Sequence, residues 1–333
     1  MLFFYKSPNG LNKQLSSSLI HVYRKTRIFA AFLTMLGFLS QPLMAQNPLS
    51  SATGFNLFTE GNVRVATNES EGPMAIGGNL TIAGTYQISS VNAGLTISGV
   101  PISLVVKGGL VFTSGKLTIN NDKYIKIGNC GSPTNLKVWY VDNNNAASNI
   151  RITEASQPYP NPQPAFIEIN KQAPNFPGGV SAVNNRVCEN VSLDMAVAFT
   201  TLRANSLNLT NCTDNIKTTN ANGDVITNLQ GANLYLADDN PNATGPRIWN
   251  VSGNDLNAVN EIITNFTFSA SRPLIINVNA PGDFEWDIKN QNFSGGLKYV
   301  IWNFYNATKL TLKTGDSVDG SILAPNADVF KET

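Results

Sequence analysis

The chain has 333 residues, of which 42% are hydrophobic and 14% are charged, and its formal net charge is +1. This composition excludes an intrinsically disordered chain and a collagen-like repeat. An average domain has roughly 25% charged residues, whereas 44 asparagines supply much of the polar content here. We therefore expect a globular protein whose surface consists mainly of neutral hydrogen-bonding groups.

The N-terminal segment has the organisation of a secretory signal peptide. A basic stretch (24–27) precedes an apolar run (28–39), and Ala45 provides the small residue of a cleavage site. As a helix the run would be about 18 Å long, too short for a hydrocarbon core of about 30 Å. We expect residues 1–45 to be a signal peptide with an extended n-region and residues 46–333 to be the exported domain. An uncleaved N-terminal anchor is the alternative.

The exported part contains no histidine, because His21 is the single one in the chain. This excludes Ser–His–Asp and Cys–His catalysis, His-ligated zinc, and the two-His-one-carboxylate iron site. Without the leader the chain has 18 basic and 22 acidic side chains, a net charge of −4. No basic stripe and no second long apolar run is present. We therefore expect no enzyme activity, no cofactor, no bound metal, no nucleic-acid partner and no transmembrane segment after signal cleavage.

Short alternating segments separated by Gly or Asn predict short strands with tight turns. The word Leu-Thr-Ile recurs around Thr81, Thr96 and Thr118 at intervals of 15 and 22 residues. Such a repeat is typical of a β-solenoid, in which each coil buries its aliphatic residues against the next. Asparagine fits this architecture because it tolerates left-handed corners and its amide can hydrogen-bond between coils. The predicted strands are 62–66, 74–76, 80–82, 95–97, 104–106, 117–119, 124–127, 234–236, 247–251, 274–278, 299–302 and 310–312.

One amphipathic helix is predicted over 192–206. Met195, Phe199 and Leu202 follow the i, i+4, i+7 spacing of one helix face, and Ser192 can cap the N-terminus. We expect the helix to lie along the solenoid with these three residues inward. The mature fold class is thus mainly β, a β-solenoid with one packed helix.

Six prolines fall within residues 157–180. Proline removes a backbone donor and breaks helices, so this stretch is predicted to be neither a helix nor a central strand. We expect a surface excursion.

Three cysteines allow at most one internal disulfide in an exported protein. Cys188 and Cys212 bracket the predicted helix and are the favoured pair. Pairing of Cys130 with either of them, and three free buried thiols, are the alternatives.

Several words in the chain resemble the bacterial choice-of-anchor A domain, in order from residue 54 to residue 329. The opening words are 55–58, 61–62 and 71–81, and the closing words are 301–310 and 320–327. The resemblance implies an exported bacterial cell-surface domain, thought adhesive, built as a β-solenoid with a helix packed along it. Its partner would be an extracellular ligand such as host matrix, a glycan or a neighbouring cell surface. The family's C-terminal surface anchor is not found before Thr333, so we expect a truncated domain or an anchor beyond that residue.

The strongest catalytic pattern is Asp283-Phe284-Glu285-Trp286-Asp287. Alternation places three carboxylates on one face of a strand and two aromatic rings on the other. Paired carboxylates can hydrolyse glycosides or bind calcium. The favoured interpretation is a solenoid strand with its rings in the core and its acids in water, and we assign no catalytic residue.

Two weaker patterns suggest other ligands. The acidic stretch 238–242 could bind calcium, although an Asx-turn is the favoured interpretation. The outward threonines Thr81, Thr96 and Thr118 suggest a sparse ice-binding array. We therefore expect a non-enzymatic adhesive or structural module. The alternatives are a carbohydrate-active enzyme that uses Asp283, Glu285 and Asp287, and an ice or small-ligand binder.

Overall fold

The computed structural model describes residues 47–332, apart from 90, 98, 161–164, 173–174, 176–178, 180–185 and 314–316. The predicted signal peptide, residues 1–45, lies outside the described residues. Within the part that is described, no helix is long and apolar enough to cross a membrane.

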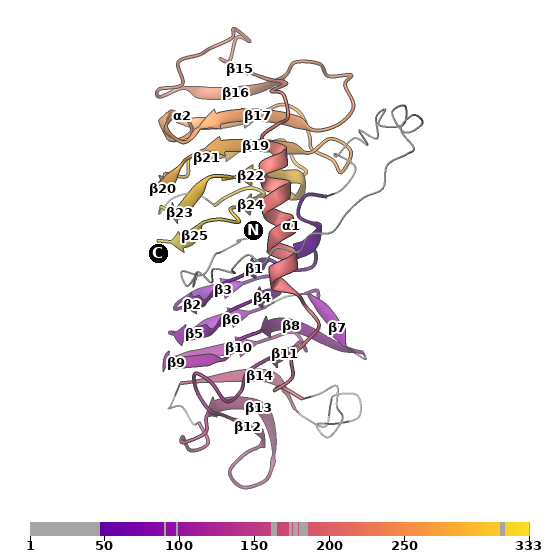
Figure 1. Ribbon diagram of the computed structural model, residues 1–333, viewed down its shortest axis with the longest axis vertical. Coiled ribbons are helices and arrows are strands. Elements are labelled where there is room, and N and C mark those ends of the chain that lie inside the picture. The colour runs from indigo at the N-terminus through magenta and orange to yellow at the C-terminus, as the bar shows by residue number, and fades with distance from the viewer. Residues whose placement is uncertain are drawn as a thin grey trace, which may run out of the picture.

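The described chain forms two stacks of short strands joined by one long helix, which confirms the predicted mainly β class (Figure 1). The chain enters near the middle of the molecule and builds the N-terminal stack, β1 to β14, toward one end. Helix α1 then runs back along both stacks. The C-terminal stack, β15 to β25, begins at the opposite end and returns to the middle (Figure 1).

Each stack has three sheets in which most strands pair in parallel. The first sheet of the N-terminal stack contains β1 (Leu57–Thr59), β4 (Met74–Ile76), β8 (Val100–Val106) and β11 (Tyr124–Ile127), with β7 (Leu95–Ile97) antiparallel beside β8. The second contains β2 (Val63–Val65), β5 (Leu80–Ala83) and β9 (Leu110–Ser114). The third contains β3 (Asn68–Ser70), β6 (Tyr86–Ile88), β10 (Lys116–Ile119), β14 (Phe166–Gln172), β13 (Ala147–Glu154) and β12 (Leu136–Val141).

The C-terminal stack repeats this arrangement. Its first sheet contains β17 (Arg247–Ser252), β19 (Leu274–Asn279), β22 (Val300–Asn303) and β24 (Ser321–Leu323). Its second contains β20 (Gly282–Trp286), β23 (Ala307–Leu312) and β25 (Asp328–Lys331), and its third contains β15 (Ile216–Thr219), β16 (Asn233–Asp238), β18 (Glu261–Thr264) and β21 (Asn290–Asn292). The short helices are η2 (Ser50–Ala52), α2 (Gly253–Ala258) and η5 (Leu297–Tyr299). Every strand predicted from the sequence overlaps an observed strand.

The prediction of a surface excursion over 157–180 is wrong for its middle part. Strand β14 lies inside its sheet, paired with β10 on one side and β13 on the other. The six prolines flank this strand but leave 165–172 free of proline, so its backbone N–H groups can join the ladder. Counting prolines over a wide window concealed a short strand.

Glycine and asparagine form a stacked corner between successive layers of the N-terminal stack. Asn79 donates its backbone N–H to Oδ1 of Asn62 (2.8 Å), and Gly109 donates to Oδ1 of Asn79 (2.9 Å). A Cβ added at Gly77 would lie 2.3 Å from the carbonyl oxygen of Glu60, so the coils approach too closely for a side chain there. Both predicted uses of asparagine are confirmed, since Asn68, Asn121 and Asn145 also adopt positive φ.

Helix α1 (Met195–Leu209) begins three residues later than predicted. Its N-cap is Asp194 and not Ser192, because Asp194 is extended and its Oδ1 accepts the N–H of Val197 (3.0 Å). The predicted inward residues are all buried: Met195, Phe199 and Leu202. The Phe199 ring stacks on Phe58 of β1 with centroids 5.6 Å apart.

Helix α1 also connects the two stacks. Among the described residues, no strand pair joins a sheet of one stack to a sheet of the other. On the N-terminal side, Arg203 pairs with Glu60, and Nδ2 of Asn205 donates to the carbonyl of Pro48 (2.9 Å). On the C-terminal side, buried Ser206 bonds to buried Asn303. Helix α1 therefore makes side-chain contacts with both stacks, and Ile248, Ile275 and Ile301 of the C-terminal stack belong to the same core cluster as the helix and the N-terminal stack.

The disulfide joins Cys130 to Cys188, so the favoured pairing of Cys188 with Cys212 is wrong. Cys188 forms a bridge pair with Ile127 at the end of β11, and this brings it beside the turn that carries Cys130. Cys212 follows helix α1, whose 15 residues extend about 22 Å away, and it is a free thiol.

Candidate functional site

The three carboxylates predicted on one strand lie at the surface of β20 and just beyond its end. Asp283 and Glu285 are exposed, Phe284 is half-buried and Trp286 is buried, as the alternation predicts. Their functional groups do not converge. Oε2 of Glu285 lies 3.2 Å from Nζ of Lys313, which raises the pKa of that lysine, and Asp287 pairs with a different lysine, Lys289. Neither of the two hollows described below is lined by these acids.

The acidic stretch 238–242 is occupied by basic partners. Oδ2 of Asp238 accepts from Nε of Arg247 (2.8 Å), and its other oxygen accepts from Arg272 (2.8 Å). Oδ1 of Asn240 accepts the N–H of Asn242 (3.2 Å), which is the predicted Asx-turn. Asp239 pairs with Lys217, so the side-chain oxygens of this stretch that calcium would need are committed to arginines, to a lysine and to the turn.

The three threonines of the predicted ice-binding array do not share a face. Thr81 lies in β5, Thr96 in β7 and Thr118 in β10, and these strands belong to three different sheets. Thr96 is exposed and Thr118 is buried. The repeated word therefore marks successive sides of the stack and not equivalent positions on one side.

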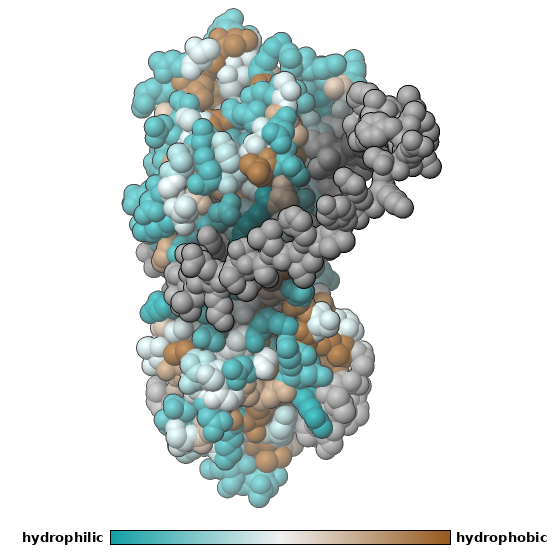
Figure 2. Space-filling view, viewed as in Figure 1, coloured by the Kyte–Doolittle hydropathy of each residue, from teal (hydrophilic) through white to brown (hydrophobic). Residues whose placement is uncertain are grey.

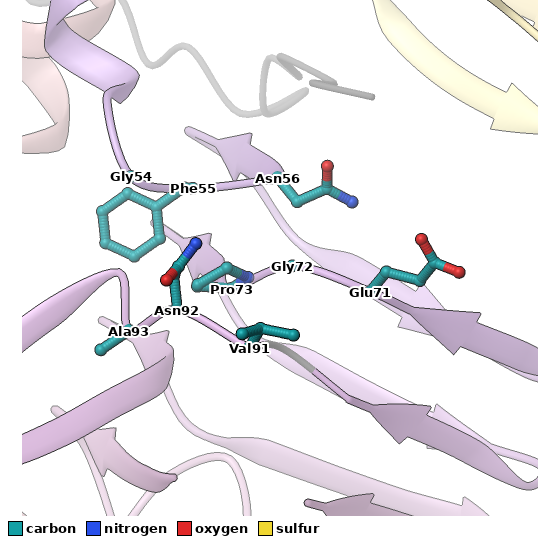
Figure 3. A pocket seen from close by; sticks show the side chains of 9 residues that line it. All are labelled: Gly54, Phe55, Asn56, Glu71, Gly72, Pro73, Val91, Asn92 and Ala93. Carbon is teal, nitrogen blue, oxygen red and sulfur yellow. The ribbon is translucent and has the colours of Figure 1, made fainter. Parts of the chain in front are cut away.

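One hollow lies beside β1 and has a volume of about 320 Å³ (Figure 3). Three successive backbone segments line it: 54–56, 71–73 and 91–93. Figure 3 shows the Phe55 ring at one end and the Glu71 carboxylate pointing away at the other. The Phe55 ring is buried and belongs to the core. Because the Glu71 carboxylate points away, the polar side chains around this hollow do not converge on one point (Figure 3).

A second hollow of about 320 Å³ lies where helix α1 ends, and we call it the asparagine hollow. None of the seven residues that line it carries a charge. They are Thr210, Asn250, Val251, Ser252, Asn277, Asn279 and Tyr305. Thr210 is the C-cap of α1. Strand β17 contributes Asn250, Val251 and Ser252, strand β19 contributes Asn277 and Asn279, and Tyr305 lies in the turn after β22. This hollow was not predicted from the sequence.

A ladder of three asparagines runs from the interior to the asparagine hollow, and two of them, Asn277 and Asn250, line it. Nδ2 of Asn303 donates to Oδ1 of Asn277 (2.8 Å), and Nδ2 of Asn277 donates to Oδ1 of Asn250 (2.8 Å). Each amide also donates to a carbonyl near the end of α1, at 2.8, 2.9 and 3.3 Å respectively, and these carbonyls belong to Ser206, Leu209 and Cys212. The last carbonyls of a helix have no intrahelical partner, and the ladder supplies donors to two of them, those of Ser206 and Leu209.

A recurring register could have revealed the ladder. Asn250, Asn277 and Asn303 are aligned across β17, β19 and β22 and follow one another at intervals of 27 and 26 residues. Each follows a large apolar residue in the sequence, namely Trp249, Ile276 and Trp302. The predicted strands 247–251 and 274–278 include Asn250 and Asn277, whereas the predicted strand 299–302 ends one residue before Asn303. The asparagines were interpreted only as general surface polarity.

A partly desolvated acid, Asp214, lies next to the asparagine hollow, although its side chain is exposed. Oδ2 of Asp214 accepts the backbone N–H of Asn250 (3.2 Å), and Oδ1 accepts that of Ile216 (3.3 Å). Burial raises the pKa of Asp214, although these backbone bonds act in the opposite direction. Burial also raises the pKa of Tyr305, so its hydroxyl stays protonated at neutral pH. The hollow is therefore neutral, with negative charge at its border.

The fold and these hollows define a mainly β domain that offers a polar, largely uncharged surface. The model of a protein family described as "Putative Ice-binding-like adhesive domain" matches residues 48–333, and the chain belongs to this family. Comparison with the curated proteins and with the solved structures gave no match. The adhesive class expected from the sequence is thus supported, in the form of this family and not of choice-of-anchor A specifically.

Proposed function

We propose that the chain is an exported, non-enzymatic adhesive module of a bacterial cell surface, related to the choice-of-anchor A type. In this proposal the two stacks are the halves of one β-solenoid, and the ligand is a glycan or a protein on host matrix or on a neighbouring cell. The observation that carries the proposal is the adhesive-family match, which extends over residues 48–333.

The polar surface of the protein supports binding through a broad contact and not through a deep pocket. Figure 2 shows hydrophilic residues spread over the visible face of both stacks, with hydrophobic residues in small separate patches. Neutral amides need little desolvation compared with ions, so a broad contact of this kind can be adhesive without a deep pocket. The carboxylates of β20 lie in the open beside lysines, which favours adhesion over the glycosidase alternative.

The proposal is tested with the full chain, produced in a bacterium with its leader. We expect export, cleavage before Gln46 on N-terminal sequencing, and retention of the purified protein on glycan arrays, matrix-coated plates or bacterial cells. Hydrolysis of a polysaccharide that is lost in Glu285→Gln would contradict the proposal and support the enzyme alternative. Absence of binding to every one of these surfaces would also contradict it.

Ice is the second candidate ligand, because the description of the family includes it. The rows aligned across the outer faces of the sheets are chemically mixed. One such row is Arg64, Thr81 and Val111, and a second contains Asp283 opposite Lys309. Alternating charges disturb a flat array of hydroxyl and methyl groups, so we expect no thermal hysteresis. Measurable hysteresis of the purified chain would establish ice as the ligand.

A further inference from the structure

We propose that the asparagine hollow binds one neutral sugar unit of the adhesive ligand, a hexose or an N-acetylhexosamine. This inference rests on the proposed adhesive function and names the chemistry of one contact within it. It concerns the seven residues that line the hollow and the charges around them.

The size of the hollow suits a single pyranose ring. Its volume of about 320 Å³ is at the lower end of the roughly 300–1,000 Å³ usual for small-molecule sites. The hollow is open on one side, because Asn250 and Asn279 at its border are exposed. A ring can therefore enter while the rest of a glycan chain continues into solvent.

The polar groups of the hollow match sugar hydroxyls. The floor is preorganised, because Asn277 is buried and all of its amide atoms are bonded to Asn250, Asn303 and the end of α1. The border keeps free capacity. Oδ1 of Asn279 accepts from Nδ2 of Asn306 (2.7 Å), and no hydrogen bond from Nδ2 of Asn279 is seen among the described residues. Amides and hydroxyls both donate and accept, as sugar hydroxyls do.

Tyr305 supplies the aromatic surface that sugar recognition commonly uses. Its backbone is fixed on both sides, because Phe304 before it is fully buried and its own carbonyl accepts from Nδ2 of Asn326 (3.1 Å). The side chain is half-buried, and no partner of its hydroxyl is seen in the described part of the chain. Such a ring can stack on the apolar face of a pyranose while its hydroxyl bonds to the sugar.

The charges around the hollow select against anionic sugars. Asp214 bonds to the backbone of Asn250 and Asp255 bonds to Ser252, so two exposed carboxylates lie beside the lining residues. No lysine or arginine is among the lining residues to balance a sialic acid or a uronic acid. Like charges in a partly desolvated site repel each other, so we expect neutral sugars to bind preferentially.

The test is a titration of the full-length exported protein with the methyl glycosides of glucose, galactose and N-acetylglucosamine. Binding is measured by ligand-observed NMR. Glucuronic acid and sialic acid are titrated in parallel. We expect at least one neutral glycoside to bind more tightly than either acid. Tyr305→Leu should weaken that binding by about tenfold, which corresponds to about 1.4 kcal/mol, and Asn279→Ala should weaken it severalfold.

Two matched variants control for general damage. Tyr235→Leu removes a half-buried tyrosine from β16, in a different sheet, and Asn290→Ala removes an exposed asparagine with a single side-chain bond, to Glu261. Both should bind the sugar as the wild type does. Equal binding by Tyr305→Leu and Tyr235→Leu would overturn the inference, as would preference for the acidic sugars. If the protein adheres to cells or matrix but none of the glycosides binds, the hollow is excluded and the adhesive function stands. If nothing binds at all, both proposals fail.

Discussion

Replacement of Asn303 by alanine should destabilise the protein strongly, because this side chain joins a coil to helix α1 without access to water. Asn303 is fully buried. It donates to Ser206 O (2.8 Å) and to Asn277 Oδ1 (2.8 Å), and it accepts from Ser206 Oγ (2.5 Å). Each buried bond contributes about 1 kcal/mol net, and the groups left unsatisfied add a desolvation penalty of about 1–3 kcal/mol. For the three bonds together we therefore expect a loss of about 4–6 kcal/mol in the free energy of unfolding.

Urea titration followed by tryptophan fluorescence measures this loss, because Trp302 directly precedes Asn303 and is buried. The matched control is Asn260→Ala, which removes an exposed hydrogen bond from Nδ2 of Asn260 to Oδ1 of Asn233 (2.8 Å). This change should lower the free energy of unfolding by less than about 0.5 kcal/mol. A double-mutant cycle with Ser206→Ala should give a coupling energy of about 1 kcal/mol or more. The reasoning is refuted if Asn303→Ala costs no more than Asn260→Ala, or if the cycle shows no coupling.

Three further predictions concern other parts of the structure. Cys130→Ser should lower the free energy of unfolding by about 4 kcal/mol, the value that the chain-entropy model gives for a sequence separation of 58. Peptide mapping of the unreduced wild type should find Cys212 alkylated, and a cross-linked Cys212 would contradict the observed pairing. Asp214→Asn should raise stability near pH 7, because burial raises the pKa of the carboxyl and so penalises its ionised form in the folded state, and the gain should shrink as the pH falls through that raised pKa. Identical pH profiles of unfolding for the two proteins would exclude it. Gly77→Ala should destabilise by more than about 1 kcal/mol, because its Cβ would meet the backbone of Glu60 at 2.3 Å, and an unchanged urea midpoint would show that the coils are not packed so closely.

The strands and the main helix could be predicted because their signals are local. Alternation in segments such as 80–82 and 274–278 has a period that a single strand expresses by itself, and the apolar spacing of Met195, Phe199 and Leu202 is complete within one helix. The helix cap was misplaced by two residues, which is the usual uncertainty at helix ends. None of these features depends on how distant coils meet.

The disulfide and the interior strand β14 were mispredicted because both depend on long-range register. Cys130 and Cys188 are separated by 58 residues and meet only because the chain returns to the end of β11 after it has formed β12, β13 and β14. Proximity in sequence favoured Cys212 instead, but a straight helix separates the cysteines at its two ends. Local spacing cannot decide a contact that parallel pairing of remote segments creates.

The ladder was missed for a different reason, which is that asparagine is ordinarily an exposed residue. Asn277 and Asn303 are 2% and 0% exposed, so their polarity belongs to the interior. Their common register becomes visible only when segments 26 or 27 residues apart are aligned as neighbouring strands of one parallel sheet. The glycosidase pattern shows the converse, since its three carboxylates were the most prominent local motif and lie apart at the surface.

The choice of a neutral amide at these positions follows from the number of bonds each rung must make. A lysine could donate to the end of α1 but could not accept from the next rung, and its charge would be costly at a position with no exposure. A carboxylate could accept but would face the helix carbonyls with negative charge. An amide does both, so Asn303 and Asn277 can pass the ladder outward to exposed Asn250. The same chemistry that joins the helix to the stack thus ends at Asn250, which is exposed at the border of the asparagine hollow.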